Sequence, residues 1–136
     1  MAVNAPLNGR EPQLYARHFL GTVRTPDLIA GLRYFRRRIG RPLILVWDHL
    51  STHRARPVRD FLARHTADYH VEWLPGYAPE LNPEESCNNC VKLAMTNIVP
   101  HSDAELRAAA RLNFQRLGRK PHLLRHFFEY AHLSVT

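Results

Sequence analysis

The sequence predicts an α/β fold with a mixed sheet flanked by helices, and three observations lead to this expectation. An uninterrupted apolar run, PLILVW, spans residues 42–47 and is typical of a buried strand. A second strand pattern follows at residues 70–74, after a stretch with helical periodicity. Helix-start signals stand before and after both runs. Strands that alternate with helices along a chain are typical of α/β folds.

The length and composition favour a single domain over residues 1–136. Hydrophobic residues make up 45% of the chain and charged residues 23%, which suits a packed core and excludes a disordered or collagen-like protein. No apolar run approaches the roughly 18 to 20 residues of a membrane span. Residues 1–10 also lack the pattern of a signal peptide. We therefore expect a cytoplasmic protein with no membrane partner.

Five stretches of the chain carry the patterns of regular elements. They are a hairpin, a helix, a central strand, a helix followed by a strand, and a group of C-terminal helices, at residues 1–20, 26–39, 42–48, 54–74 and 83–136. The hairpin prediction depends on the pair Asn8-Gly9, which suits a tight turn. The first helix is predicted from Thr25 as N-cap, Pro26 as the first helical residue and Gly40 at its end. The central strand is expected to be covered on both faces, because its apolar residues do not alternate with polar ones.

The C-terminal helices are predicted from their start signals. Asn82 and Pro83 follow a Pro-rich loop and have the residue types of an N-cap and a first helical residue. Ser102 and Glu105 have the spacing of a capping box, and Pro121 suits the first turn of a last helix.

The chain carries a net charge of +7, from 19 basic and 12 acidic residues, and 17 of the basic residues are arginines. The net charge is +6 over residues 1–41, −2 over residues 42–100 and +3 over residues 101–136. Because the guanidinium group matches the geometry of phosphate oxygens, this balance favours DNA as a partner. The alternative is a general bias of composition toward arginine. Arg36, Arg37 and Arg38 suit either reading.

Two acidic positions are candidates for a metal site. Asp48 directly follows the apolar run, where open α/β sheets place their ligands, although an aspartate there also suits a turn cap. Glu84 and Glu85 start a predicted helix, where carboxylates also complement the helix dipole. If the fold brings Asp48 and Glu85 together, the pair suits Mg²⁺, which binds one or two carboxylates together with substrate phosphates. Phosphoryl transfer with two metal ions usually needs a third carboxylate.

Basic and imidazole side chains lie close to Asp48 in the sequence. His53 is expected either to orient a carboxylate, a phosphate or a metal-bound water, or to bond to the backbone of a turn. Arg54, Arg56 and Arg59 are expected to contact DNA phosphates, and a solvated helix face is the alternative.

Cys87 and Cys90 form a lone CxxC motif. A structural zinc site needs four ligands, and the chain has no second pair of cysteines. We therefore expect two reduced, partly buried thiols, as is usual in the cytosol.

Two segments resemble a known family. They are LILVWDHLSTHRARPVRDFL at residues 43–62 and VEWLPGYAPELNPEE at residues 71–85, followed by Lys92. Together they are similar to the catalytic core of DDE-type transposases from bacterial insertion sequences of the mariner-like superfamily. The resemblance implies an RNase H-like fold and DNA cleavage and strand transfer with Mg²⁺ or Mn²⁺. It also implies that Asp48 is the second catalytic acid and metal ligand, that Glu85 is the third, and that Lys92 is a nucleic-acid contact.

The chain departs from the family pattern at its start. No acidic residue precedes Glu11, and Glu11 falls in the predicted hairpin turn, so nothing matches the first acid of the family. Asn88 also stands where the family commonly has tryptophan. The expectation is therefore a truncated RNase H-like fold, the C-terminal part of a catalytic core, in which the strand at residues 42–48 has an unpaired edge.

Three functional hypotheses remain open at this point. The first is a DNA-bound, nucleoid-associated transposase fragment that cleaves little or no DNA alone. The second is a non-catalytic nucleic-acid-binding or regulatory remnant, which pairs with a full-length or complementary transposase subunit through the unpaired edge. The third is a decayed reading frame whose product does not fold stably.

Overall fold

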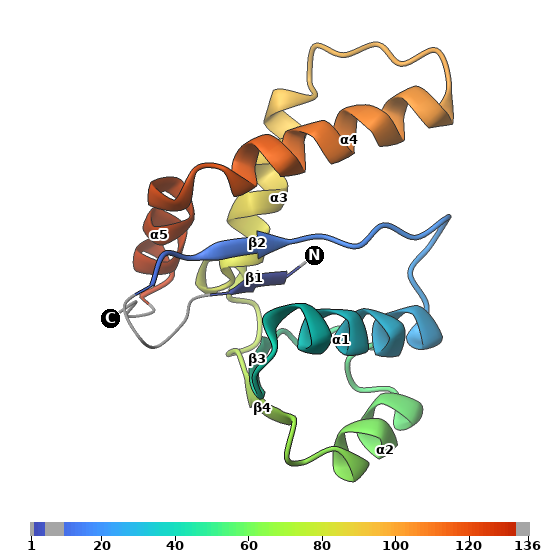
Figure 1. The fold of residues 1–136 in the computed structure, drawn as a ribbon, viewed down its shortest axis with the longest axis vertical. Coiled ribbons are helices and arrows are strands. Elements are labelled where there is room, and N and C mark those ends of the chain that lie inside the picture. Colours follow the sequence, from blue (N-terminus) through green and yellow to red (C-terminus); the bar gives the residue numbers. More distant parts are fainter. Residues whose placement is uncertain (1, 5–9, 133–136) are drawn as a thin grey trace. The chain divides into compact units, whose positions relative to one another are not determined.

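The computed structural model describes residues 2–4 and 10–132, and the chain packs into two compact units (Figure 1). The terminal unit consists of Met1–Ala16 and Glu80–Thr136, and the middle unit consists of Arg17–Pro79. Each unit contains helices and two strands, so the predicted α/β class is confirmed. The expected single mixed sheet is wrong for the described residues, because the strands form two separate two-stranded sheets.

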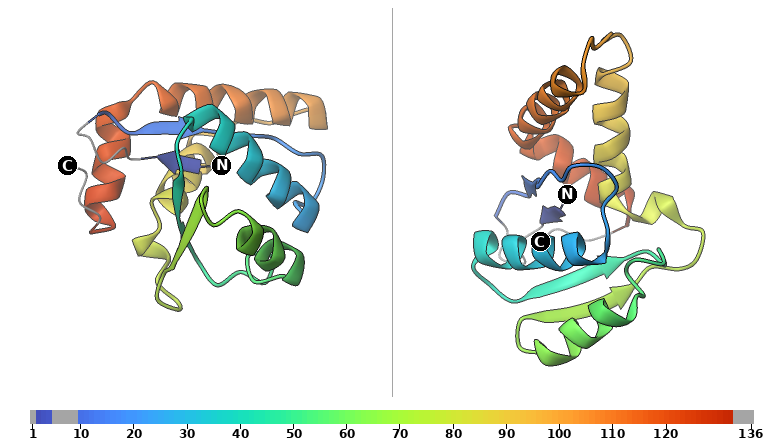
Figure 2. Two further views of the ribbon diagram at one scale, coloured as in Figure 1. Left: turned by 60° about the horizontal axis from the view of Figure 1, so that its bottom comes forward. Right: turned by 90° about the vertical axis from the view of Figure 1, so that its right-hand side faces the viewer.

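The middle unit is built from four elements in helix–strand–helix–strand order. They are α1 (Thr25–Ile39), β3 (Leu43–Trp47), α2 (Arg56–Arg64) and β4 (Tyr69–Trp73). The two strands are parallel, with Leu43 opposite Tyr69 and Trp47 opposite Trp73, and Figure 2 shows them side by side. Because paired parallel strands end at the same sheet edge, Trp47 and Trp73 lie together at the carboxyl end.

Only one face of this sheet packs against the helices. Leu43, Leu45 and Trp47 pack against a buried cluster formed by one residue from α1, one from α2 and one from β4: Leu32, Phe61 and Tyr69. On the opposite face Ile44 is 60% exposed and Val46 is 38% exposed. The expectation that the strand is covered on both faces is therefore wrong for the described residues. The uninterrupted apolar run did not reveal which face is buried.

The first helix begins one residue earlier than predicted. Arg24, and not Thr25, is its N-cap, and the Arg24 backbone N–H donates to Oδ2 of Asp27 at 2.9 Å. The Asp27 carboxylate thus accepts the N–H of the N-cap residue, a different contact from the side-chain cap that was expected of Thr25. The predicted end is confirmed, because Gly40 adopts a left-handed φ of 76° and its N–H donates to the Arg36 carbonyl.

The terminal unit combines a short hairpin with three helices. Its elements are β1 (Ala2–Asn4), β2 (Gln13–Tyr15), α3 (Pro83–Ala94), α4 (Asp103–Gly118) and α5 (Pro121–Tyr130), and a 3-10 turn, Pro79–Leu81, precedes α3. Its core contains Cys87, Val91, Leu117 and Leu124. The strands are antiparallel, as expected, and the predicted turn at Asn8-Gly9 lies outside the described residues.

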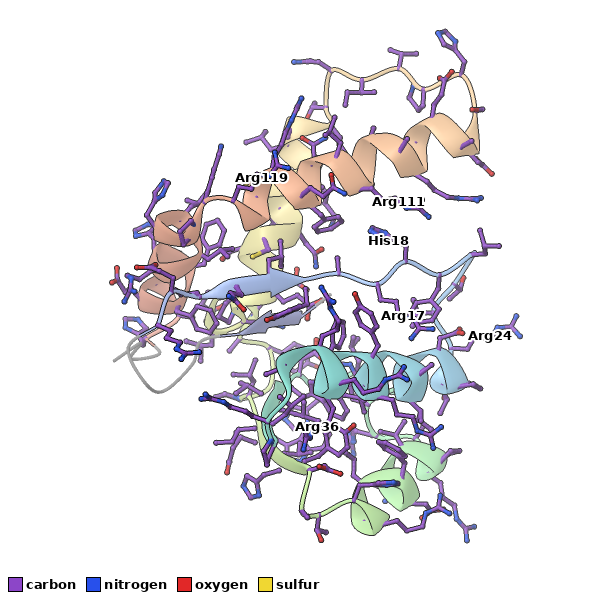
Figure 3. The ribbon with its side chains drawn as sticks, in the orientation of Figure 1. Arg17, His18, Arg24, Arg36, Arg111 and Arg119 are labelled. Carbon is purple, nitrogen blue, oxygen red and sulfur yellow. The ribbon has the colours of Figure 1, made fainter. Side chains whose placement is uncertain are left out.

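The second strand ends earlier than the hairpin predicted for residues 1–20. β2 ends at Tyr15, and Arg17 is held by the middle unit. The Arg17 guanidinium donates to the Ala30 carbonyl of α1 at 3.3 Å and lies 5.4 Å from the Tyr34 ring centroid (Figure 3). These contacts attach the Arg17 side chain to α1.

The predicted starts of the C-terminal helices are confirmed. Oδ1 of Asn82 accepts from the Glu84 backbone N–H at 3.1 Å, and Oγ of Ser102 accepts from the Glu105 backbone N–H at 3.2 Å. Pro121 is the first residue of α5. Within the described part of the chain, no helix is long and apolar enough to span a membrane.

Candidate functional site

Asp48 lies at the carboxyl end of β3, where the sequence predicts it. Its Oδ1 accepts from the Leu50 backbone N–H at 3.2 Å and lies 2.8 Å from Nδ1 of His53. The turn-capping alternative is therefore correct for the Leu50 contact. Both readings of His53 have a contact in the structure: Nδ1 lies 2.8 Å from the Asp48 carboxylate and 3.3 Å from the Asp48 backbone carbonyl oxygen.

His53 is held on two sides. Its ring stacks on the Trp47 indole, with centroids 4.4 Å apart and planes 9° apart, and its side chain is 17% exposed. The His53 backbone N–H donates to the Leu50 carbonyl at 3.0 Å, so the turn that carries the imidazole is closed by its own backbone. A fixed imidazole in turn restricts the Asp48 carboxylate to one orientation.

The Asp48 carboxylate suits a hard cation. In the part of the chain that the structure describes, both of its side-chain contacts involve Oδ1, which leaves Oδ2 to bind a ligand. Carboxylate oxygens are the ligands that Mg²⁺ prefers, together with waters and phosphates. Among residues 2–4 and 10–132, no group of three or more His, Cys, Asp or Glu side chains forms a metal cluster. Further ligands from a substrate phosphate and water fit this donor set.

The second predicted ligand, Glu85, lies in the first turn of α3. Its backbone N–H donates to the Asn82 carbonyl at 3.0 Å, and its side chain is half-buried. Lys92 is exposed in the last turn of the same helix. Since Asp48 belongs to the middle unit and Glu85 to the terminal unit, their convergence on one cation stays a prediction.

The arginines near Asp48 are exposed: Arg54 lies in the turn before α2, and Arg56 and Arg59 lie on α2, whose buried residues are Val58 and Phe61. Arg54 and Arg59, together with His49 and Trp73, line an open hollow of about 540 Å³. Arg56 lies elsewhere on the helix, with Nε 3.7 Å from Oδ2 of Asp60. The three predicted phosphate-binding arginines therefore have different surroundings.

Arg36 has a structural role in the middle unit. Its Nε and Nη2 both lie 2.9 Å from Oδ1 of Asp68, so the guanidinium connects α1 to the residue before β4 (Figure 3). Burial of the Tyr69 phenol, with a smaller contribution from the Asp68 carboxylate, raises the Tyr69 pKa, and Arg36 lowers it. Arg37 and Arg38, by contrast, are exposed. Figure 3 also marks Arg111 and Arg119 on and just after α4 in the terminal unit.

Cys87 and Cys90 are free thiols on α3, the first buried and the second half-buried. Burial, with smaller contributions from the nearby Glu84 carboxylate and Cys90, raises the pKa of Cys87 to about 12. Both observations agree with the predicted pair of partly buried thiols.

We expect iodoacetamide to modify Cys90 before Cys87 in the native protein at pH 7.5. The thiolate is the nucleophile, and a pKa near 12 leaves only roughly one Cys87 thiol in 10⁴ to 10⁵ ionised. Peptide mass spectrometry after timed labelling measures the two rates, and urea-unfolded protein is the control in which both thiols react. Equal labelling of the two cysteines in the native protein would contradict the burial of Cys87.

Two lining residues of the hollow, His49 and Trp73, were not singled out from the sequence. Trp73 stands opposite Trp47 in the strand pair, and His49 directly follows Asp48. Their positions in the sequence could have indicated them, because both lie at or just after the ends of the predicted strands. The stacking of these two rings depends on the pairing of β3 with β4, which no sequence pattern specified.

The middle unit is an α/β unit with an acidic residue at the carboxyl end of a parallel strand pair, beside arginines that face solvent. The family model of the DDE superfamily endonucleases matches residues 7–107, and the chain belongs to this family. No curated protein and no solved structure matches the chain in the corresponding comparisons. The resemblance to DDE-type enzymes is thus confirmed at the level of the superfamily.

Proposed function

We propose that this chain is the C-terminal part of the catalytic core of a DDE-type transposase from a bacterial insertion sequence of the mariner-like superfamily. The complete core catalyses metal-dependent DNA cleavage and strand transfer. The chain alone cleaves little DNA. One observation carries the proposal: a carboxylate held by His53 at the end of β3, inside the segment that matches the DDE superfamily endonucleases.

In this proposal each candidate residue has one role. Asp48 and Glu85 bind Mg²⁺ or Mn²⁺, and His53 holds the Asp48 carboxylate in position. When bound, the cation activates a water and stabilises the leaving oxygen of the DNA phosphate. The phosphates themselves are contacted by the basic residues Arg54, Arg56, Arg59 and Lys92.

Weak activity of the chain alone follows from the acids that it contains. The family pattern has three catalytic acids, and only Asp48 and Glu85 match in this sequence. A missing carboxylate weakens the retention and positioning of the cations that stabilise the attacking and leaving oxygens. The first acid of the family pattern must therefore come from elsewhere in an active enzyme.

The proposal is tested by Mn²⁺ binding in the presence of terminal-repeat DNA, followed by electron paramagnetic resonance. We expect Asp48→Asn and Glu85→Gln each to weaken Mn²⁺ binding by about tenfold or more, because each removes a charged ligand. Glu84→Gln is the matched control, since it removes the same charge one residue away, and we expect little change.

Cleavage of the same labelled DNA with Mg²⁺ or Mn²⁺ tests the second part of the proposal. We expect little or no product from the chain alone. Efficient cleavage that disappears in Asp48→Ala would show that the chain is active without a further acid. Equal Mn²⁺ affinity of wild type, Asp48→Asn and Glu85→Gln would refute the shared metal site.

The unpaired edge of β3 favours a second candidate, a regulatory remnant that binds a transposase subunit. Among the described residues, β3 pairs only with β4, and the adjoining sheet face exposes Ile44 and Val46. Such an edge is a template for a strand of another chain. DNA binding without metal dependence, and co-elution with a full-length transposase without cleavage, would favour this candidate.

A further inference from the structure

We propose that the hollow lined by His49, Arg54, Arg59 and Trp73 binds an unpaired nucleotide of a DNA strand. The base stacks on the aromatic rings, and the arginines hold the adjoining phosphate. This inference rests on the proposed function and deepens it, because it specifies the state of the DNA beside Asp48.

The two aromatic side chains of the hollow, His49 and Trp73, are stacked on each other and exposed to solvent. Trp73 is 44% exposed, and its ring lies 5.4 Å from the His49 ring with only 14° between their planes. Trp47 adjoins Trp73 at 6.1 Å and is itself stacked on His53. Nucleic-acid bases stack on exposed aromatic rings of this kind, with little dependence on sequence.

The guanidinium groups of the two arginines in the hollow are available to bind an anion. In the part of the chain that the structure describes, neither Arg54 nor Arg59 forms an ion pair, whereas Arg36 is paired with Asp68 and Arg56 lies near Asp60. An uncompensated guanidinium fork at a solvent-open site suits a phosphate group, which it can contact through two parallel hydrogen bonds. The hollow, at about 540 Å³, is in the size range of small-molecule sites.

The combination of rings and arginines selects among forms of DNA. Arginines alone bind duplex and single-stranded phosphates alike. Aromatic stacking requires a base whose face is free, and the faces of paired bases are covered by their neighbours in a duplex. His49 directly follows Asp48, so the hollow adjoins the candidate metal ligand.

The test compares two DNA hairpins that differ by one base. The first carries a single unpaired thymidine in its stem, and the second carries an abasic site at the same position, so the backbone and its charge are equal. Titrations are made in EDTA, where no metal-dependent step contributes. We expect the thymidine hairpin to bind roughly 5- to 150-fold more tightly, the range for stacking of one base.

Substitutions test whether the preference for the thymidine hairpin arises at the hollow. We expect Trp73→Ala to abolish the preference and Trp73→Phe to retain most of it, because phenylalanine keeps a stacking face. In a Trp47→Phe background, Trp73 is the sole tryptophan, and we expect the thymidine hairpin to quench its fluorescence. Tyr130→Ala, which removes an exposed aromatic ring from the terminal unit, is the control and should keep the preference.

Equal affinity for the two hairpins, or a preference that survives Trp73→Ala, would overturn the stacking site. The outcome is separable from that of the metal experiment. If Mn²⁺ binding depends on Asp48 and Glu85 but the base preference is missing, only the inference about the hollow fails. If the preference is present but Mn²⁺ binding is insensitive to both acids, the proposed function fails and the nucleotide site remains.

Discussion

Phe61→Ala is expected to destabilise the middle unit by about 3 to 5 kcal/mol. The Phe61 side chain is 2% exposed and joins α2 to both α1 and β4 through Leu32 and Tyr69. Its ring centroid lies 4.4 Å from that of His65, and the Arg33 guanidinium lies 5.2 Å from it. Truncation therefore removes apolar burial and leaves a cavity where three elements meet. Since small domains have free energies of unfolding of about 5 to 15 kcal/mol, the loss is a large fraction of the total.

Urea unfolding followed by tryptophan fluorescence measures this loss, because both tryptophans, Trp47 and Trp73, lie in the middle unit. Leu50→Ala is the matched control: Leu50 is an exposed apolar side chain of the same unit, and we expect its loss to change the free energy of unfolding by less than about 0.5 kcal/mol. A Phe61→Ala midpoint equal to that of Leu50→Ala would contradict the packing described for the helix-facing side of the sheet.

Affinity for duplex DNA is expected to fall about 150-fold between 50 and 200 mM salt. The estimate takes four phosphate contacts, from Arg54, Arg56, Arg59 and Lys92, and a slope of about −0.9 for each contact in a plot of log affinity against log salt. Each contact releases a condensed counterion, so the four together give a slope of about −3.6. Fluorescence anisotropy with a labelled duplex at several salt concentrations measures the slope.

Alanine substitution of each of the four residues should make the slope shallower by about 0.9. Arg107→Ala is the control, because Arg107 is an exposed arginine of α4 beside Asp103 and lies outside the candidate interface. We expect its effect on the slope to be small. A slope near zero in the wild-type protein would refute phosphate binding by these four residues, and an equal effect of all five substitutions would refute their assignment as the phosphate contacts.

The helix boundaries were largely predictable from the sequence because they depend on neighbouring residues. Asn82 and Ser102 cap α3 and α4 through groups two or three residues away, and Gly40 ends α1 by its own backbone conformation. The exception at the start of α1 has a local cause as well. Asp27 accepts the Arg24 N–H, and the N-cap lies one residue earlier than predicted.

The candidate site was predictable in its residue types and only partly in its contacts. The apolar run before Asp48 predicted that Asp48 lies at a strand end. The spacing of five residues predicted that His53 lies near Asp48. The sequence left several roles open for that histidine. Its stacking on Trp47 and its contact with Oδ1 of Asp48 depend on the conformation of the turn after β3, which the sequence pattern did not specify.

Charge alone did not separate the arginines of the middle unit. Arg36, Arg54 and Arg59 look alike in the sequence, yet Arg36 is bound to Asp68, 32 residues away, while Arg54 and Arg59 line the hollow beside Trp73. Ion pairs between distant segments depend on how helices and strands pack, which no local pattern records. For the same reason, the exposed face with Ile44 and Val46 was not foreseen.

The sequence by itself determined the α/β class, most helix starts and the strand that carries Asp48, because hydrophobic periodicity and capping act over a few residues. It also contained the motifs of the DDE superfamily. The tertiary structure alone decided which sheet face is buried, which arginines are paired and how the rings of His49 and Trp73 align. These features arise from contacts between residues far apart in the chain, and the packing of whole elements sets them.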